Sequence, residues 1–139
     1  MVGAIVDRCK HVYVRNVPHK GRGVFANAPF NVGDLIEKSP TWAFNSSEER
    51  LLERTGLFEY YFIRPLPTLI ESKISGYVVF GLISIVNHSF NPNSQIVWID
   101  DDTGTWACIV ALKDIKVGEE VTHRYANIHD YPSTITFVE

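Results

Sequence analysis

Several features that mark common protein classes are scarce or missing in this chain of 139 residues. It has two cysteines, Cys9 and Cys108, which are not spaced as a metal-binding pair, and isolated thiols in an intracellular protein are usually reduced. Its longest weakly polar run, residues 76–86, is about half the length of a membrane span. Charge appears at Asp7, too early for a signal peptide. We therefore expect a soluble intracellular protein with no membrane association.

The chain also lacks a strong excess of charge of either sign, since its formal net charge is −3. A general nucleic-acid-binding protein would be basic, so we predict no direct contact with nucleic acid. What the sequence does contain is enough apolar material for a core, with a hydrophobic fraction of 45% and aromatic residues spread along its length. The length fits one domain over residues 1–139.

Short strands dominate the sequence pattern, and no long amphipathic helix is evident. In the N-terminal part of the chain, three strands are predicted, at residues 11–15, 24–26 and 35–37, with turns between them. Residues 95–99 and 106–112 predict a hairpin with an acidic tip. Residues 120–125 predict the last strand, after a turn at residues 116–119. Many short strands with little helix indicate a mainly β fold and disfavour a dinucleotide-binding α/β fold.

Three segments between these strands are less regular. Ser46, with Glu49 three residues later, predicts a capping box that opens a short helix ending near Thr55, before Gly56. The aromatic and β-branched residues 57–63 predict a strand. Residues 82–86 are compatible with strand or helix, and we favour a helical turn that leads into Asn87.

A glycine-rich turn follows Lys20, where Gly21 and Gly23 flank Arg22. Two glycines around one residue allow positive φ and a close approach of the backbone to a ligand. The third glycine and the helix of a dinucleotide fingerprint are missing. On this motif alone, a tight structural turn is the more common explanation.

The second motif is residues 87–93, which read Asn-His-Ser-Phe-Asn-Pro-Asn. A histidine in this setting is most often a core residue, and it can otherwise serve as a base or a ligand. Asn87 and His88 both offer fixed hydrogen-bonding groups without net charge, which suits an adenine ring or an amino group. None of the five histidines has a second histidine four residues away or a cysteine partner, so we predict no metal site.

The third motif is residues 118–125, which read Gly-Glu-Glu-Val-Thr-His-Arg-Tyr. Taken alone, it fits an ordinary turn and strand in which Tyr125 is a packing residue. Upstream, Tyr60 and Tyr61 lie in an aromatic run, for which a core strand is an ordinary explanation. A nucleophile elbow and an activated cysteine are both missing, which disfavours a hydrolase.

Together and in this order, the three motifs resemble the SET domain of protein-lysine methyltransferases, over about residues 11–126. The resemblance implies the SET fold, in which small sheets of β-clip type surround a knot-like core, with residues 127–139 as a C-terminal tail. The chain is similar to the compact standalone SET proteins of viruses and bacteria. Some compact members form homodimers, and a homodimer is an open alternative here.

The same resemblance implies roles for individual residues. S-adenosyl-L-methionine, which leaves as S-adenosyl-L-homocysteine, would be contacted by Lys20, Gly21, Arg22, Gly23, Asn87 and His88. Tyr125 would be the catalytic residue, with Tyr60 beside it. His123 and Tyr61 would line the substrate channel and set how many methyl groups are added.

The implied reaction is methyl transfer to the ε-amine of a lysine in a protein or peptide. A histone H3-like tail is the suggested substrate, with another lysine-rich protein as the alternative for a bacterial chain. The working location would be the cytoplasm, or the nucleus, including a host nucleus, for a viral or eukaryotic chain. His123 and Ala126 depart from the family pattern, and they motivate the rival hypothesis of a catalytically inactive SET-like module that binds a peptide or small ligand.

Overall fold

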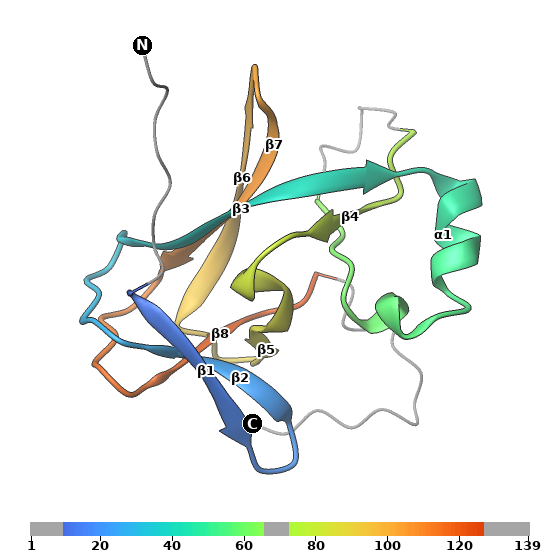
Figure 1. Cartoon of the computed structure of the whole chain (residues 1–139). Helices are drawn as coiled ribbons and strands as arrows, with labels where there is room; N and C mark the ends of the chain where they lie inside the picture. Colours follow the sequence, from blue (N-terminus) through green and yellow to red (C-terminus); the bar gives the residue numbers. More distant parts are fainter. Residues whose placement is uncertain (1–9, 66–72, 127–139) are drawn as a thin grey trace.

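The structure, a computed structural model, describes residues 10–65 and 73–126, which fold into strands and short helices (Figure 1). In these residues the strands form two four-stranded sheets, ordered β1-β2-β8-β5 and β4-β3-β7-β6. The strands are β1 (Val12–Val17), β2 (Gly21–Ala26), β3 (Leu35–Phe44), β4 (Gly76–Val79), β5 (Asn87–His88), β6 (Ser94–Asp101), β7 (Gly104–Ala111) and β8 (Glu120–His123). The helices are α1 (Ser46–Leu52) and two 3₁₀ turns, η1 (Gly56–Glu59) and η2 (Leu82–Ile85). The predicted mainly β class with short helices is confirmed.

The first sheet brings together segments that are far apart in the sequence. β1 and β2 form an antiparallel hairpin, and β2 pairs antiparallel with β8, Val24 opposite Val121. β8 in turn pairs with β5 in parallel, with His88 opposite His123. The glycine-rich motif lies on β2, the second motif begins on β5, and the third runs along β8. This strand order therefore places all three sequence motifs in one sheet.

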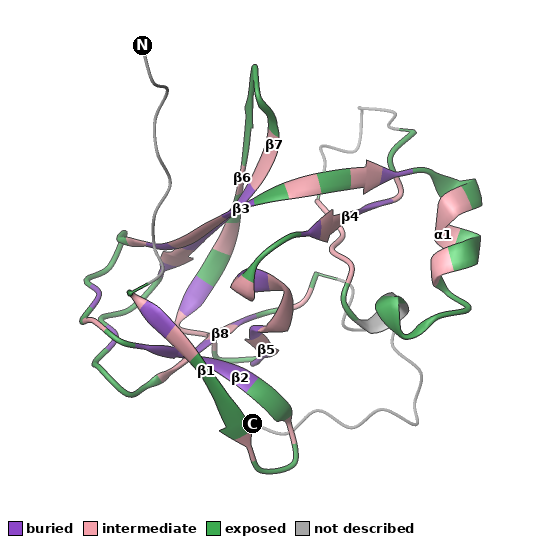
Figure 2. Ribbon diagram, viewed as in Figure 1, coloured by how far each residue is buried: buried purple, intermediate pink, exposed green. Residues whose placement is uncertain are grey.

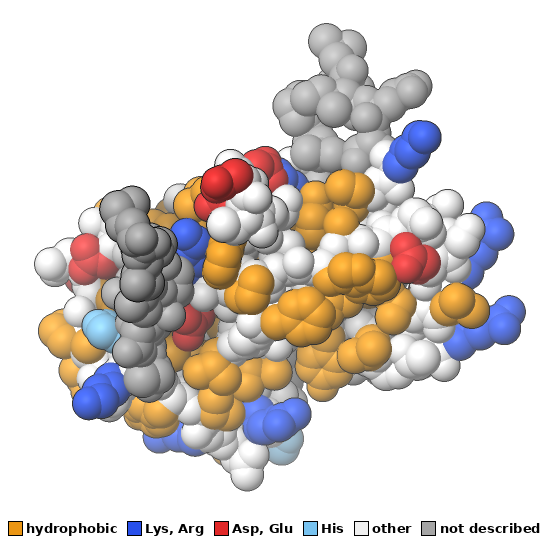
Figure 3. Space-filling model, turned by 45° about the horizontal axis from the view of Figure 1, so that its top comes forward, with side chains coloured by type: hydrophobic (Ala, Val, Ile, Leu, Met, Phe, Trp, Pro, Cys, Tyr) orange, Lys and Arg blue, Asp and Glu red, His pale blue; other side chains and the backbone are white. Residues whose placement is uncertain are grey.

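The second sheet carries the predicted hairpin. β6 and β7 pair along their full length, from Ser94 opposite Ala111 to Asp101 opposite Gly104, and the hairpin tip projects at the top of Figure 1. On one face of β6 the side chains of Val97 and Ile99 are exposed. Hydrophobic side chains also gather on the face of the molecule below the acidic hairpin tip in Figure 3.

The core lies where the two sheets meet η2. Ile83 of η2 is fully buried, and η2 contacts β2, β3, β4 and β7. Apolar side chains from both sheets surround it, including Val24, Ile36, Ile109 and Val121. Figure 2 shows buried residues on the strands of both sheets, whereas α1 carries no buried residue. The predicted helical turn before Asn87 is confirmed, and it anchors the second motif in the core.

The predicted start of the helix is wrong by one residue. Asn45, not Ser46, is the cap: its side chain accepts the Glu48 N–H at 3.0 Å, and the Glu48 carboxylate accepts the Asn45 N–H at 3.1 Å. The helix ends at Leu52 rather than near Thr55. Asparagine is as good a cap as serine, so the shift by one residue is small. Thr55, where the helix was expected to end, caps η1: its hydroxyl accepts the Leu57 N–H.

The predicted strand over residues 57–63 is also wrong. This segment begins with η1, and its β pairing is limited to Phe62, which exchanges two backbone hydrogen bonds of 2.8 Å with Tyr77. Tyr60, Tyr61 and Phe62 instead line a cavity that is described below. None of the helices within residues 10–65 and 73–126 is long and apolar enough to cross a membrane.

Candidate active site

Hydrogen bonds tie the three motifs together at one point. The Asn87 side-chain nitrogen donates to the Arg22 carbonyl oxygen at 3.1 Å and to Oε2 of Glu120 at 2.7 Å. The Lys20 ammonium lies 3.5 Å from Oε1 of the same glutamate. Asn87 lies on β5, Glu120 on β8 and Arg22 on β2, so the contacts join three neighbouring strands of the first sheet.

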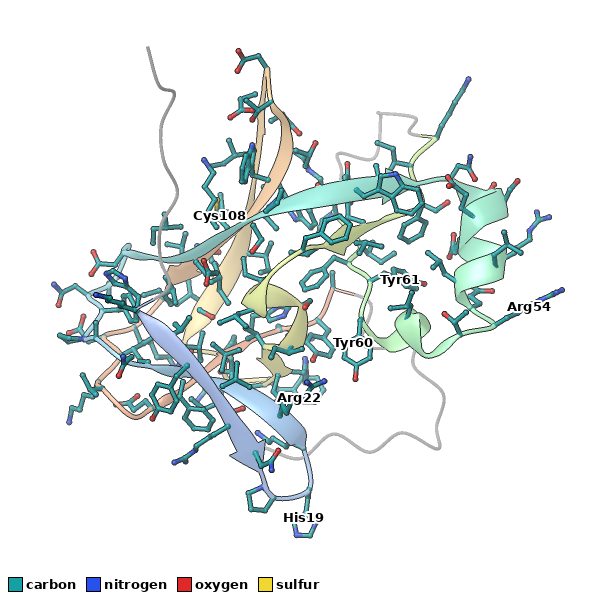
Figure 4. The ribbon with its side chains drawn as sticks, viewed as in Figure 1. His19, Arg22, Arg54, Tyr60, Tyr61 and Cys108 are labelled. Carbon is teal, nitrogen blue, oxygen red and sulfur yellow. The ribbon has the colours of Figure 1, made fainter. Side chains whose placement is uncertain are left out.

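A cavity of about 320 Å³ opens beside this point, and we call it the polar cavity. Its wall includes Lys20, Gly21, Arg22, Tyr60, Ser84, Asn87 and Tyr125. Figure 4 shows Arg22 and Tyr60 approaching this region from β2 and from the segment after η1. Its volume lies at the lower end of the range for small-molecule sites, about 300–1,000 Å³.

The two glycines of the first motif are needed for different reasons. Gly21 has φ +81°, and a Cβ there would meet nothing within 4 Å, so its backbone is open to the cavity. Gly23 is buried, and a Cβ there would lie 2.6 Å from Oε2 of Glu120 and 3.1 Å from the Asn87 side-chain nitrogen. Glycine at position 23 therefore makes room for the hydrogen bond between Asn87 and Glu120. A direct cofactor contact by Gly23 stays a prediction.

His88 lies behind the site rather than in the wall of the polar cavity. It is 3% exposed, and its Nδ1 accepts the backbone N–H of Tyr125 at 2.9 Å. Its ring centroid lies 5.1 Å from that of Tyr125. His88 thus fixes the chain where it leaves β8, and its predicted contact with a cofactor stays a prediction.

Tyr125 is the half-buried residue on which the two sides of the site converge. Its hydroxyl donates a hydrogen bond of 3.0 Å to the carbonyl oxygen of Val86, just before the second motif. Since the backbone is held by His88 and the hydroxyl by Val86, both ends of the side chain are fixed. The phenol therefore has a defined orientation.

A second cavity of about 440 Å³, which we call the aromatic cavity, also borders Tyr125. Its wall includes Tyr60, Tyr61, Phe62, Trp98, His123 and Tyr125. Three residues, Tyr60, Ser84 and Tyr125, line both the polar and the aromatic cavity. Two spaces of different chemistry therefore meet at these three side chains.

His123 is a buried histidine in the wall of the aromatic cavity. It is 3% exposed and stacks on Phe62, with 5.7 Å between ring centroids and 9° between planes. The pKa of His123 is lowered to about 4, mainly by burial and to a smaller extent by the nearby His88, while a contact with the Arg124 backbone partly opposes the shift. Neither ring nitrogen has a hydrogen-bond partner of good geometry among the described residues. His123 therefore contributes a neutral, buried ring to the wall of the aromatic cavity.

The two predicted channel tyrosines occupy different positions. Tyr60 lines both cavities and is 44% exposed, whereas Tyr61 lines the aromatic cavity and packs its edge on Phe44, with 5.2 Å between ring centroids. Ser84 and Glu120 belong to the site although sequence reasoning did not select them. Glu120 lies inside the third motif and could have been noticed there, but Ser84 lies in an apolar run that gives no signal.

Within the described residues, no group of three or more potential ligands could hold a metal ion.

Comparisons with known proteins agree with this geometry. A family model described as the SET domain matches residues 21–126. A histone-lysine N-methyltransferase of Schizosaccharomyces pombe, described as specific for H3 lysine-37, is 32% identical over 115 residues, covering 82% of this chain and 72% of that protein. The Drosophila melanogaster histone-lysine N-methyltransferase Set8 is 28% identical over 135 residues, covering 87% of this chain and 18% of that protein.

Solved structures show the same fold. The Neurospora SET-domain protein DIM-5, a histone lysine methyltransferase, superimposes with a TM-score of 0.65 at 20% identity, covering 92% of this chain and 55% of that one. At that identity the likeness bears on the fold alone, and it confirms the expected SET architecture. The matched motifs, the shared fold and the sequence identity to the yeast protein together show that this chain belongs to the SET-domain family of protein-lysine methyltransferases.

Proposed function

We propose that this protein transfers a methyl group from S-adenosyl-L-methionine to the ε-amine of a protein lysine. The observation that carries the proposal is the meeting of two chemically different cavities at one oriented phenol, Tyr125. The polar cavity would take the methyl donor, and the aromatic cavity would take the lysine side chain.

The wall of the polar cavity fits the proposed donor. Gly21 leaves its backbone open, and the cationic side chains of Lys20 and Arg22 suit the carboxylate of an amino acid. The Asn87 nitrogen already donates to Arg22 and Glu120, so its side-chain oxygen can accept a hydrogen bond from the donor molecule without adding charge. When bound, the cofactor supplies an activated methyl group on a sulfonium, so the protein needs only to bind, orient and exclude water.

The aromatic cavity fits the other reactant. A lysine amine has a reference pKa near 10.4, which leaves roughly 0.04% in the neutral, nucleophilic form at pH 7. A wall that includes Phe62 and Trp98 disfavours the charged ammonium and so lowers the lysine pKa. Correct placement of two reactants can contribute about 7–11 kcal/mol in favourable cases.

Tyr125 would orient the amine lone pair toward the methyl group, with Tyr60 on the opposite wall. The account requires no strong general base, because the dry cavity itself favours the neutral amine. His123 and Tyr61 also line the aromatic cavity, where added methyl groups would be accommodated or excluded. We therefore propose these two residues as determinants of the product state.

A histone H3-like tail is the proposed substrate. The support is that the two curated relatives described above are histone-lysine methyltransferases by name. A lysine-rich tail can be extended, which suits entry of one long side chain into the aromatic cavity. The formal net charge of −3 also favours the approach of a basic peptide, though weakly.

The proposal is tested in two steps on the full chain. Thermal unfolding with S-adenosyl-L-homocysteine at 100 times its dissociation constant should show a stabilisation of about 2.7 kcal/mol. Mass spectrometry of core histones incubated with labelled methyl donor should then locate the modified lysine. Binding without turnover on any lysine substrate would favour the rival binding module, and no binding at all would contradict the proposed function.

A further inference from the structure

The carboxylate of Glu120 has no part in the reaction as described, yet it lies at the contact that joins the three motifs. We infer that Glu120 is a positioning residue that holds the Asn87 amide in one orientation and pairs with Lys20 in the polar cavity. The inference rests on the proposed function in one respect, because it assigns that cavity to the methyl donor.

Each oxygen of Glu120 has its own partner. Oε2 accepts a hydrogen bond of 2.7 Å from Asn87, and Oε1 lies 3.5 Å from the Lys20 ammonium. The side chains of Lys20 and Glu120 are 12% and 17% exposed, so solvent screens their interaction only partly. A carboxylate with two different partners at this depth fixes the relative positions of β2, β5 and β8.

The orientation of the Asn87 amide follows from its neighbours. The Arg22 carbonyl oxygen, at 3.1 Å, and the Glu120 carboxylate can both only accept hydrogen bonds. The nitrogen of the amide must therefore face them, and its oxygen must face away. An amide fixed in this way presents a carbonyl oxygen as an acceptor, without having to rotate when a ligand arrives.

Gly23 provides independent support. A Cβ at that position would come within 2.6 Å of Oε2 of Glu120 and 3.1 Å of the Asn87 nitrogen. Position 23 is buried beside the polar cavity, and its neighbour Gly21 forms part of the wall. A Cβ at position 23 would therefore press on both partners of the hydrogen bond that orients Asn87, and also on Val17, whose Cγ2 would lie 2.8 Å away.

The test is a double-mutant cycle on the full-length chain, with S-adenosyl-L-homocysteine as the probe and calorimetric affinity as the readout. The variants are Glu120→Ala, Asn87→Ala and the double variant, with Glu120→Gln as the conservative change. Glu119→Ala is the matched control, because it removes the same charge from the neighbouring, exposed position. Thermal unfolding of every variant reports the loss of stability separately.

We expect Glu120→Ala to weaken binding by roughly tenfold, since a hydrogen bond to a charged group is lost. In the Asn87→Ala background the same change should weaken it about twofold or less, because there is no amide left to orient. Glu120→Gln keeps an acceptor oxygen and should restore most of the affinity, while Glu119→Ala should leave it unchanged.

An equal loss of affinity in both backgrounds would overturn the positioning role, since a purely structural effect adds independently. The same conclusion would follow if Glu120→Ala lowered the unfolding temperature and left affinity unchanged. Either result would leave the proposed function standing, because the wild-type chain would still bind the probe. Absence of binding by the wild-type chain would overturn both.

Discussion

The polar and aromatic cavities meet at the same side chains, but they are built in opposite ways. Around the polar cavity, hydrogen bonds and an ion pair link residues from three strands, including Asn87 and Glu120. Around the aromatic cavity, rings pack on one another, and His123 stacks on Phe62 without a well-formed hydrogen bond to the described residues. Under the proposed function, the polar contacts would fix the position of the methyl donor, whereas the aromatic wall would favour the neutral form of the lysine amine. This difference predicts that variants will separate into distinct classes.

Tyr125→Phe should have the largest effect, because Tyr125 belongs to both cavities. Loss of the hydroxyl removes the group that orients the amine and the hydrogen bond to the Val86 carbonyl. We expect the rate of methyl transfer to fall by roughly 10²–10³, the cost of removing one donor that acts in the transition state. Single-turnover kinetics with labelled methyl donor measure this rate. Affinity for S-adenosyl-L-homocysteine should change little, and a variant as active as wild type would contradict the shared role.

His123→Phe should remove a pH dependence of stability that belongs to the aromatic cavity. The pKa of His123 is about 4 in the folded chain and near 6.5 when unfolded. The unfolded chain thus binds more protons between these values. The contribution of His123 to the free energy of unfolding is fully present above pH 6.5. It is lost as the pH drops toward 4, by up to roughly 3 kcal/mol. Chemical unfolding at several pH values measures the loss, and the variant should lose less. Equal slopes for both proteins would show that His123 is not buried in its neutral form.

Asn87→Ala should damage the polar cavity alone. It leaves the Glu120 carboxylate without its closest donor, and an unsatisfied partly buried acceptor costs about 1–3 kcal/mol. We expect the dissociation constant of S-adenosyl-L-homocysteine to rise by roughly tenfold, with little change in KM for a lysine peptide. Calorimetry and steady-state kinetics separate the two quantities. A higher peptide KM with unchanged cofactor affinity would reverse the assignment of the two cavities.

Arg64→Ala should have the smallest effect, and only on the aromatic cavity. The Arg64 guanidinium donates two hydrogen bonds, of 2.9 and 2.8 Å, to the carboxylate of Asp100 and so ties the segment after Tyr61 to β6. This pairing lowers the pKa of Asp100 to about 2, but the carboxylate is exposed and solvent weakens the bond. We expect a rise of a few fold in peptide KM and no change in cofactor affinity. Asp100→Asn should give the same result, and a change in cofactor affinity in either variant would argue against separate cavities.

The sequence predicted the parts of the fold that depend on local patterning. The β6–β7 hairpin is evident from two apolar strands around an acidic tip, and the turn before Asn87 from a short apolar run. The same reasoning wrongly predicted a strand over residues 57–63, because aromatic composition does not distinguish a strand from a cavity wall. The start of the helix was predicted one residue too late because asparagine and serine are nearly equivalent caps, and the sequence places them side by side at positions 45 and 46.

The site was less predictable from the residues themselves. Its convergence followed from the resemblance to a family, since spacing along the chain does not show that β5 and β8 pair in parallel. The structure gives Gly23 and His88 supporting roles, since Gly23 lies beside Glu120 and His88 holds the backbone of Tyr125. A direct contact of either residue with a ligand stays a prediction. Ser84 carries no sequence signal, because its place between the cavities depends on how η2 packs in the core.

We propose that a methyl group passes between the two cavities at Tyr125, and a comparison of the wild-type protein with Tyr125→Phe tests this transfer. Core histones are incubated with labelled methyl donor and either wild-type protein or Tyr125→Phe, and modified lysines are quantified by mass spectrometry. We expect methylated lysine with the wild-type protein, and at least roughly a hundredfold less methylated lysine with the variant. Equal methylation by both proteins would contradict the claim, because transfer would not then depend on that hydroxyl.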